Sequence, residues 1–225
     1  MKTMLSWSSG KDSAWALKVL NESACIEVCG LFTTVNAAFD RVAMRTRCGG
    51  SSSRRRHGQP DCLCTPFDIP YPCSNDTERM GAFVDRAKEE GVEAMAFGDL
   101  YLADIRAYRE RMLAGTGITP LFPLWGQDTG KLARTMIAAG LRAHVTCIDP
   151  KRLDPSFVGR SFDLDFLNAL PMGVDPCGEN GEFHTLAVAG PMFGTEIRAR
   201  AGEITERDGF VFADFVAAPA GTGGN

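Results

Sequence analysis

The chain has 225 residues, a formal net charge of −4, and a composition that is 44% hydrophobic and 23% charged, which is typical of a soluble protein with one large domain or two small ones. It contains no apolar run of the ~18 residues that a membrane-spanning helix requires, and its N-terminus has no secretory signal, so we expect a cytoplasmic protein with mostly reduced cysteines. The negative charge argues against extended binding to a nucleic-acid backbone, and no contact with a membrane is expected.

Hydrophobic patterning divides the chain into alternating strands and helices. In chain order it predicts a strand at 2–6, a helix at 13–20, a strand at 26–35, a helix at 76–90, a strand at 92–97, a helix at 103–113, a strand at 118–124, a helix at 129–139 and a strand at 143–148. This alternation is typical of an α/β protein with a parallel sheet and right-handed crossovers. Residues 196–215 have the pattern of a β-hairpin, and residues 217–225 are expected to be disordered.

Between the first strand and the first helix lies the sequence S-S-G-K-D-S, residues 8–13. In an open α/β sheet, ligands bind beyond the carboxyl ends of the strands, which is where this segment lies. Its small residues let backbone N–H groups approach an anion, the helix N-terminus adds a partial positive charge, and Lys11 adds a full one. We therefore predict a phosphate-binding loop, although the order differs from the common G-x-x-x-x-G-K-[ST] motif. The alternative is a polar strand-to-helix turn with a serine cap.

The segment resembles the pyrophosphate loop, S-G-G-K-D-S, of the N-type ATP pyrophosphatases, with Ser9 in place of the first glycine. Three further segments, AFGDLYLADIRAYRER, GITPLFPLWGQDTGKLA and GVDPCGENGEFHT, are similar to the diphthine–ammonia ligase family and its bacterial relatives. The resemblance implies a doubly wound parallel sheet of the pyrophosphate-loop, or adenine nucleotide alpha hydrolase-like, type. We expect an ATP-binding domain at residues 1–125 and a smaller C-terminal α+β substrate-binding domain at 126–216.

The resemblance also implies a reaction, in which an acceptor oxygen attacks the α-phosphorus of ATP and pyrophosphate leaves. Charge develops on the leaving phosphates, so positioned cations are needed. Lys11 supplies one charge, and we expect Asp12 to bind Mg²⁺, unless it only interacts favourably with the helix dipole. The residues predicted to bind ATP are Ser6, Ser8, Ser9, Gly10, Lys11, Asp12, Ser13, Gly98 and Asp99. The predicted catalytic residues are Lys11, Asp12, Glu179, Glu182 and His184.

Gly98 and Asp99 follow a predicted strand, where the glycine allows a ligand to approach closely. Asp99 either binds Mg²⁺ or substrate, or caps the next helix. In the block G-E-N-G-E-F-H-T, residues 178–185, strand alternation would put Glu182 and His184 on the same side. An acid and an imidazole on one side suit proton transfer from ammonium. The alternative is a solvated turn before a strand at 185–189.

Cysteine-containing segments have mainly structural interpretations. In the sequence C-S-N, residues 73–75, Ser74 and Asn75 are predicted to cap the following helix rather than to take part in catalysis. Cys177 is predicted to be a small buried hydrophobic residue, since no second cysteine is near it in the sequence.

Residues 45–67, RTRCGGSSSRRRHGQPDCLCTPF, fit neither a secondary-structure period nor the family. Their arginines, cysteines and histidine suggest a nucleic-acid loop or a metal site. The C-x-C spacing is poor for zinc, however, so we expect poorly ordered residues that bind no metal. Translation of a GC-rich coding sequence in another frame gives an amphipathic helix and a strand here, and our hypothesis is a pair of compensating frameshifts.

The leading functional interpretation is an adenylating amide ligase, which uses ATP to join ammonia to a carboxylate and releases AMP and pyrophosphate. The resemblance suggests diphthine on elongation factor 2 as the acceptor, and a small carboxylate is the alternative. Two other functions stay open. One is RNA modification such as base thiolation, which usually needs paired cysteines and a basic surface, and the other is nucleotide binding without turnover.

Overall fold

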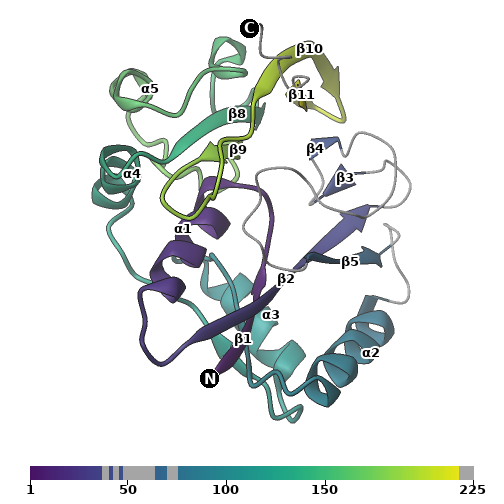
Figure 1. The fold of residues 1–225 in the computed structure, drawn as a ribbon. Helices are drawn as coiled ribbons and strands as arrows, with labels where there is room; N and C mark the ends of the chain where they lie inside the picture. Colours follow the sequence, from purple (N-terminus) through teal and green to yellow (C-terminus); the bar gives the residue numbers. More distant parts are fainter. Residues whose placement is uncertain (37–40, 43–45, 48–63, 70–75, 218–225) are drawn as a thin grey trace, which may run out of the picture.

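The computed structural model describes residues 1–36, 41–42, 46–47, 64–69 and 76–217, which form two β-sheets with helices packed around them (Figure 1). The first sheet has the strand order β4-β3-β2-β1-β6-β7, and β5 also pairs with β2. Its strands are β1 (Lys2–Ser6), β2 (Glu27–Asn36), β3 (Arg41–Val42), β4 (Thr46–Arg47), β5 (Cys64–Ile69), β6 (Ala94–Ala96) and β7 (Thr119–Leu121). The pairings β5–β2, β2–β1, β1–β6 and β6–β7 are parallel, which confirms the predicted α/β class.

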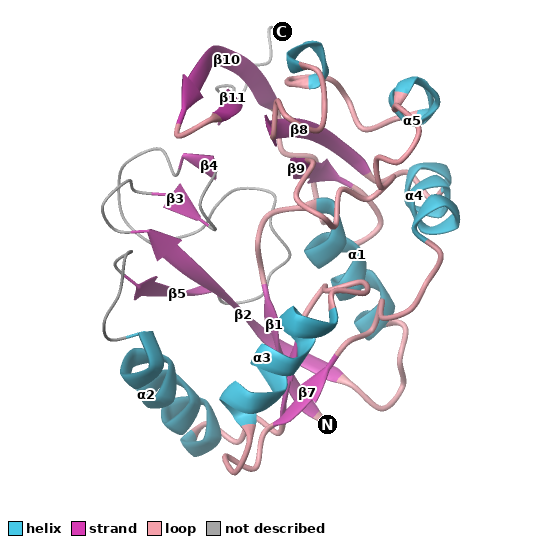
Figure 2. Cartoon of the chain, turned by 180° about the vertical axis from the view of Figure 1, so that it is seen from behind, coloured by secondary structure: helices cyan, strands magenta, loops and turns pink. Residues whose placement is uncertain are grey.

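Helices cover both faces of the first sheet (Figure 2). α1 (Lys11–Asn21) lies on one face, and α2 (Asp76–Glu89) and α3 (Ala103–Leu113) lie on the other. Leu5 belongs to the buried cluster that includes α1, whereas Met4 belongs to the cluster that includes α2. Because successive side chains of a strand point to opposite faces, one strand contributes to both clusters. This two-sided burial explains why Met4 and Leu5, which are neighbours in β1, are both apolar.

The second sheet is antiparallel and has the order β10-β11-β8-β9. Its strands are β8 (Arg142–Ile148), β9 (Phe183–Ala189), β10 (Ala199–Arg207) and β11 (Phe210–Ala217). β10 and β11 confirm the predicted hairpin. The strand predicted at 143–148 does not extend the parallel sheet, because β8 pairs antiparallel with β9 and β11. Patterning identified this strand, but its partners come later in the chain and are selected by tertiary packing.

The C-terminal part also contains α4 (Thr129–Ala138), the short helix α5 (Leu164–Ala169) and a 3-10 turn, η1 (Pro155–Phe157). Each begins after an aspartate whose carboxylate accepts a backbone N–H of the first turn. The distances are 2.8 Å from Lys131 N to Asp128, 2.9 Å from Ser156 N to Asp154 and 2.8 Å from Phe166 N to Asp163. These side chains satisfy donors that a helix start leaves unpaired, so the local sequence fixes where the elements begin.

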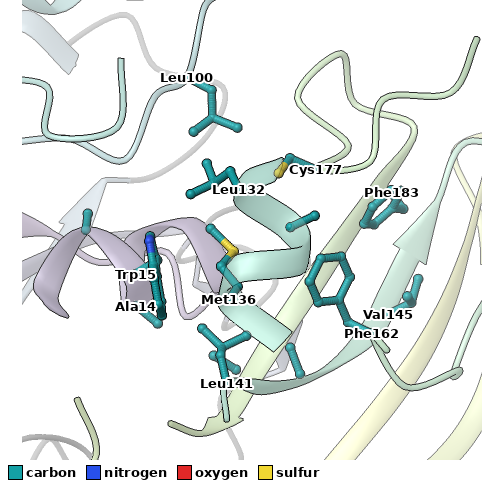
Figure 3. Close-up of a cluster of buried hydrophobic side chains, with 14 of the residues drawn as sticks. Ala14, Trp15, Leu100, Leu132, Met136, Leu141, Val145, Phe162, Cys177 and Phe183 are labelled. Atoms are coloured by element: carbon teal, nitrogen blue, oxygen red, sulfur yellow. The ribbon is translucent and has the colours of Figure 1, made fainter. Parts of the chain in front are cut away.

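One buried hydrophobic cluster joins the two parts of the chain (Figure 3). Leu132 and Met136 of α4 lie between Trp15 of α1 and the Phe162 and Phe183 rings of the C-terminal part. The cluster therefore spans the predicted boundary at residue 125, and the two-domain division stays a prediction. Its consequence is that the loop before α1 and the turn before β9 are held against a common core.

The predicted elements differ from the observed ones mainly at their ends. The helix at 103–113 is observed at the predicted bounds, whereas β6 and β7 are shorter than predicted. The predictions for Ser74 and Asn75 and for the tail after residue 217 lie outside the described residues. So does most of the segment 45–67, of which β4 and the first residues of β5 are described. In the described part of the chain, no helix is long and apolar enough to cross a bilayer.

Candidate functional site

The segment 8–13 connects β1 to α1 at the carboxyl end of β1, as predicted. The hydroxyl groups of Ser8 and Ser13 are bonded within the loop. Ser8 Oγ donates to Ser13 Oγ at 3.1 Å, Ser13 Oγ donates to Gly10 O at 3.0 Å, and Gly10 N donates to Ser8 Oγ at 3.3 Å. Gly10 is the residue before the helix and has extended backbone angles, with no side-chain cap. The loop is therefore a compact turn at a helix N-terminus, which is a site suited to an anion.

Ser9 adopts a left-handed backbone conformation, with φ of 67°. This is the position at which the resembling loop has glycine, and only Ser9 and Asp208 among the described non-glycine residues have positive φ. An L-residue in this region is disfavoured by ~1–2 kcal/mol, so the surrounding structure must hold it. One contact that does so is the bond from Ala187 N of β9 to Ser9 O, at 2.8 Å. The loop thus keeps a glycine-like backbone without the glycine.

Lys11 is buried, with 2% of its surface exposed. Its ammonium donates to Asp12 Oδ2 at 2.8 Å and to the carbonyl oxygen of Cys177. It also lies 5.5 Å and 5.4 Å from the ring centroids of Phe162 and Phe183. Burial lowers the pKa of Lys11, but the charge of Asp12 and other acidic groups outweighs burial and raises this pKa above its ordinary value. Lys11 therefore stays charged, and its charge is directed toward the C-terminal part of the chain.

Asp12 is the residue predicted to bind Mg²⁺. Its Oδ2 accepts from Lys11, while its Oδ1 is shielded from solvent and has no hydrogen-bond partner in the structure. Burial raises the pKa of Asp12, and the charge of Lys11 opposes this effect. Within the described residues, no group of three His, Cys, Asp or Glu side chains could hold a metal ion by itself. A free carboxylate oxygen fits Mg²⁺, which usually binds one or two carboxylates together with substrate phosphates and water.

Gly98 lies against the first turn of α1. A Cβ at this position would lie 3.1 Å from both Asp12 C and Ser13 N, so the close approach that requires glycine is made by the backbone of α1. Asp99 forms an ion pair with Arg109 of α3, with 3.6 Å between Oδ2 and Nε. Burial raises the pKa of Asp99 despite this partner. The alternative role of Asp99 as a helix cap is wrong, because the residue before α3 is Leu102 and no side chain caps it.

Glu179 and Glu182 belong to a tight turn, residues 175–182, that precedes β9. Glu179 Oε1 accepts Leu100 N at 2.8 Å, which ties the turn to the loop after β6. Burial, followed by the nearby charge of Asp12, raises the pKa of Glu179 to about 7. Glu182 is buried; its Oε1 accepts Asp175 N at 3.2 Å, and its Oε2 has no hydrogen-bond partner in the structure.

His184 does not share a side with Glu182. β9 begins at Phe183, so Glu182 lies in the turn and is buried, whereas His184 is exposed on the strand. Thr185 is the strand residue that faces the loop at residues 8–13, since its Oγ1 accepts Lys11 N at 3.1 Å. Strand alternation directs His184 to the opposite side. The inference from alternation was wrong because the strand starts one residue too late to include Glu182.

Cys177 is buried, as predicted, and its thiol donates to Thr129 O at 3.4 Å. Burial raises the pKa of Cys177 to about 12. A thiol with this pKa stays protonated at neutral pH, which argues against thiolate chemistry at this position.

Sequence reasoning missed three residues that hold the site together. Thr185 bonds to the loop, Tyr101 OH donates to Asp175 Oδ2 at 2.9 Å, and Asp175 Oδ1 accepts Cys177 N at 3.0 Å. The sequence offered a local signal for Asp175 alone, because an aspartate whose carboxylate accepts the backbone N–H two residues later, here that of Cys177, is typical of an Asx turn. The partnership with Tyr101, 74 residues away, had no signal.

The chain has sequence matches to a family model and to named proteins. Residues 128–214, which include the whole 175–182 turn, match the family model described as the diphthamide synthase C-terminal domain. A diphthine–ammonia ligase of Schizosaccharomyces pombe is 26% identical over 175 residues, or 75% of this chain and 27% of the relative. The human diphthine–ammonia ligase is 29% identical over 132 residues (56% and 49%), and that of Danio rerio 30% over 146 residues (62% and 57%).

These matches show that the chain is similar to proteins named diphthine–ammonia ligase, and that residues 128–214 are similar to the diphthamide synthase C-terminal domain. The chain spans about half or less of the length of the Schizosaccharomyces pombe and human relatives.

Proposed function

We propose that the chain is an ATP-dependent ligase that forms an amide from ammonia and a carboxylate; its relatives are named diphthine–ammonia ligases. In the first step, an oxygen of the acceptor carboxylate attacks the α-phosphorus, the bond from this phosphorus to the bridging oxygen breaks, and pyrophosphate leaves. In the second step, ammonia attacks the carbonyl carbon of the acyl adenylate, the bond to AMP breaks, and the proton lost by nitrogen passes to a base. The acceptor proposed is diphthine on elongation factor 2, with a small carboxylate as the alternative.

The observation that carries this proposal is the direct joining of the phosphate-binding loop to the 175–182 turn and β9. Lys11 Nζ bonds to the Cys177 carbonyl, Lys11 N to Thr185 Oγ1, and Ala187 N to Ser9 O. A ligase must bring an adenylated acceptor and an amine into near-attack geometry, so its nucleotide loop and its acceptor region must adjoin. A nucleotide-binding module without an acceptor site has no need of this junction.

The residues of the junction have distinct chemical roles in the proposed reaction. Lys11 carries the positive charge that offsets the charge developing on the leaving pyrophosphate. Asp12 Oδ1 would hold Mg²⁺, which when bound neutralises charge on the ATP phosphates. Glu179, whose pKa is about 7, and Glu182 are the candidate acceptors of the proton that ammonium must lose before its lone pair can attack. His184 has the weakest geometric support among the predicted catalytic residues.

The proposal is tested by mass analysis of nucleotides after incubation with Mg-ATP, ammonium and a panel of carboxylates that includes a diphthine-bearing protein. We expect AMP and pyrophosphate in equal amounts, and an amide whose formation requires both ammonium and one of the acceptors. Production of ADP would contradict an adenylating ligase. Unchanged ATP with measurable ATP binding would support the nucleotide-binding alternative. AMP formation without ammonium dependence would leave the adenylation step but overturn the amide product.

A further inference from the structure

Asp175 is a buried carboxylate that the proposed reaction does not use, and 7% of its surface is exposed. Its oxygens accept three donors. Oδ1 accepts Cys177 N at 3.0 Å, and Oδ2 accepts Glu179 N at 3.1 Å and Tyr101 OH at 2.9 Å. A carboxylate accepts at both oxygens, whereas an amide of the same shape accepts at only one. The set of donors thus specifies an aspartate at this position.

The two backbone bonds to Asp175 shape the turn that reaches Lys11. They fold residues 175–179 together with a bond from Gly178 N to Asp175 O at 2.8 Å. Gly178 has φ of 69°, and a Cβ there would lie 2.7 Å from Phe183 O, so the turn has little freedom to adopt another form. In this form the Cys177 carbonyl accepts from the Lys11 ammonium. That carbonyl and Asp12 Oδ2 are the two acceptors that hold the ammonium in place.

Tyr101 connects the same carboxylate to the loop that follows β6. The tyrosine is partly exposed, and Leu100 N next to it donates to Glu179 Oε1 at 2.8 Å. Asp175 thus lies where the loop after β6 and the 175–182 turn meet, while the turn itself contacts the phosphate-binding loop. A change at this carboxylate reaches Lys11 through one intervening residue, Cys177.

We propose that Asp175 is a positioning residue for the phosphate-binding loop: through the Cys177 carbonyl it holds the Lys11 ammonium at the point where a pyrophosphate group of the ligand is bound. This inference rests on the proposed function, since it takes the loop to bind the phosphates of ATP. A free lysine side chain has many rotamers and loses rotamer entropy when it binds an anion. A Lys11 side chain that is already fixed before binding does not lose this entropy again. Asp175 itself touches neither nucleotide nor acceptor.

The test is a double-mutant cycle on the affinity for inorganic pyrophosphate with Mg²⁺, measured by calorimetry on the whole chain. Asp175→Asn should weaken binding about tenfold, which corresponds to the loss of one charge-assisted hydrogen bond. In a Lys11→Met background the same substitution should change affinity less than twofold, because the residue through which it acts is gone. A purely structural role would give the same change in both backgrounds, and that result would overturn the proposal.

Two matched variants separate this effect from general damage. Tyr101→Phe removes a single donor and leaves both backbone bonds of Asp175, so it should change pyrophosphate affinity less than twofold. Asp154→Asn replaces an aspartate that caps η1 and should leave pyrophosphate affinity unchanged. A tenfold loss in either variant would show that the cycle reports on fold stability.

A second measurement does not depend on pyrophosphate. In the wild type, acetic anhydride should modify Lys11 slowly, because its side chain is 2% exposed, and Asp175→Asn should speed the modification severalfold, as read by mass spectrometry. An unchanged rate in a folded Asp175→Asn protein overturns the inference.

If that variant does not fold, hydrogen exchange in the wild type decides the question. Pyrophosphate should slow amide exchange at Cys177 N and Glu179 N, and an unchanged exchange rate at both amides overturns the inference. Absence of wild-type pyrophosphate binding would overturn the proposed phosphate role of the loop and this inference with it, whereas binding that Asp175→Asn leaves intact overturns this inference alone.

Discussion

Replacing Ser9 by glycine should make the protein more stable. Ser9 has φ of 67°, a region in which a side chain crowds its own backbone and glycine does not. The interaction that holds this residue is made by its carbonyl oxygen, which accepts Ala187 N at 2.8 Å, and a substitution of the side chain leaves that bond in place. The native conformation should therefore survive the change with its strain removed.

The magnitude follows from two opposing terms. Relief of the left-handed conformation is worth ~1–2 kcal/mol. The greater freedom of glycine in the unfolded chain offsets ~0.5–1 kcal/mol of this gain. The expected net stabilisation is about 0.5–1 kcal/mol, and for a chain of this size it should raise Tm by about 1–4 °C.

Urea and thermal unfolding of the wild type and Ser9→Gly provide the assay, with Ser156→Gly as the control. Ser156 lies in η1 and is not among the residues with positive φ, so glycine there should destabilise by ~0.5–1 kcal/mol. A Ser9→Gly protein as unstable as the control would refute the reasoning. It would mean that contacts of the Ser9 side chain, and not the backbone contacts of the loop, hold the left-handed conformation.

Further predictions concern the residues of the site. Lys11→Ala should abolish most ATP turnover while the protein still folds. The free energy of unfolding should fall by ~1–3 kcal/mol, because Asp12 and the Cys177 carbonyl lose their hydrogen-bond donor. Turnover at the wild-type rate would reject the loop assignment. Glu182→Gln should keep ATP affinity and lose amide formation, measured as separate quantities, because the neutral isostere cannot take a proton; unchanged amide formation would argue against a base at this position. The pKa of Glu179 is raised from 4.5 to about 7, so this residue stabilises the folded state fully below pH 4.5 and loses this contribution as the pH rises to about 7. Denaturant titrations over that range should show that the free energy of unfolding falls less in Glu179→Gln than in the wild type. Parallel curves for the two proteins would contradict the assignment. Gly98→Ala should destabilise the protein by ~1–3 kcal/mol and weaken ATP binding, because its Cβ would press on the first turn of α1; the control Gly81→Ala, with open space around its Cβ in α2, should be neutral or stabilising, and equal effects would exclude the steric explanation.

Local sequence determined the elements and the place of the loop at residues 8–13. The pattern at 103–113 predicted α3 at its observed bounds, because helix formation depends mainly on residues that are close in the sequence. The small residues before α1 likewise located a turn at the carboxyl end of β1, the end at which open α/β sheets generally bind ligands. These features depend on neighbours within a few positions.

Tertiary structure decided how the predicted residues are used. Gly98 makes room for the backbone of α1, Asp99 pairs with Arg109 instead of capping α3, and His184 lies on the strand face away from Thr185. Each outcome depends on a partner that no sequence period indicates. The same holds for β8, whose apolar pattern fits either sheet until β9 and β11 pair with it. Lys11 shows the difference most clearly: its motif predicts a charge offered to phosphate, whereas only the packing of a turn 166 residues away determines that the ammonium is buried and bonded to Cys177 O. Hydrogen bonds and burial between distant segments depend on the folded backbone that brings them together, and they are therefore not readable from one sequence.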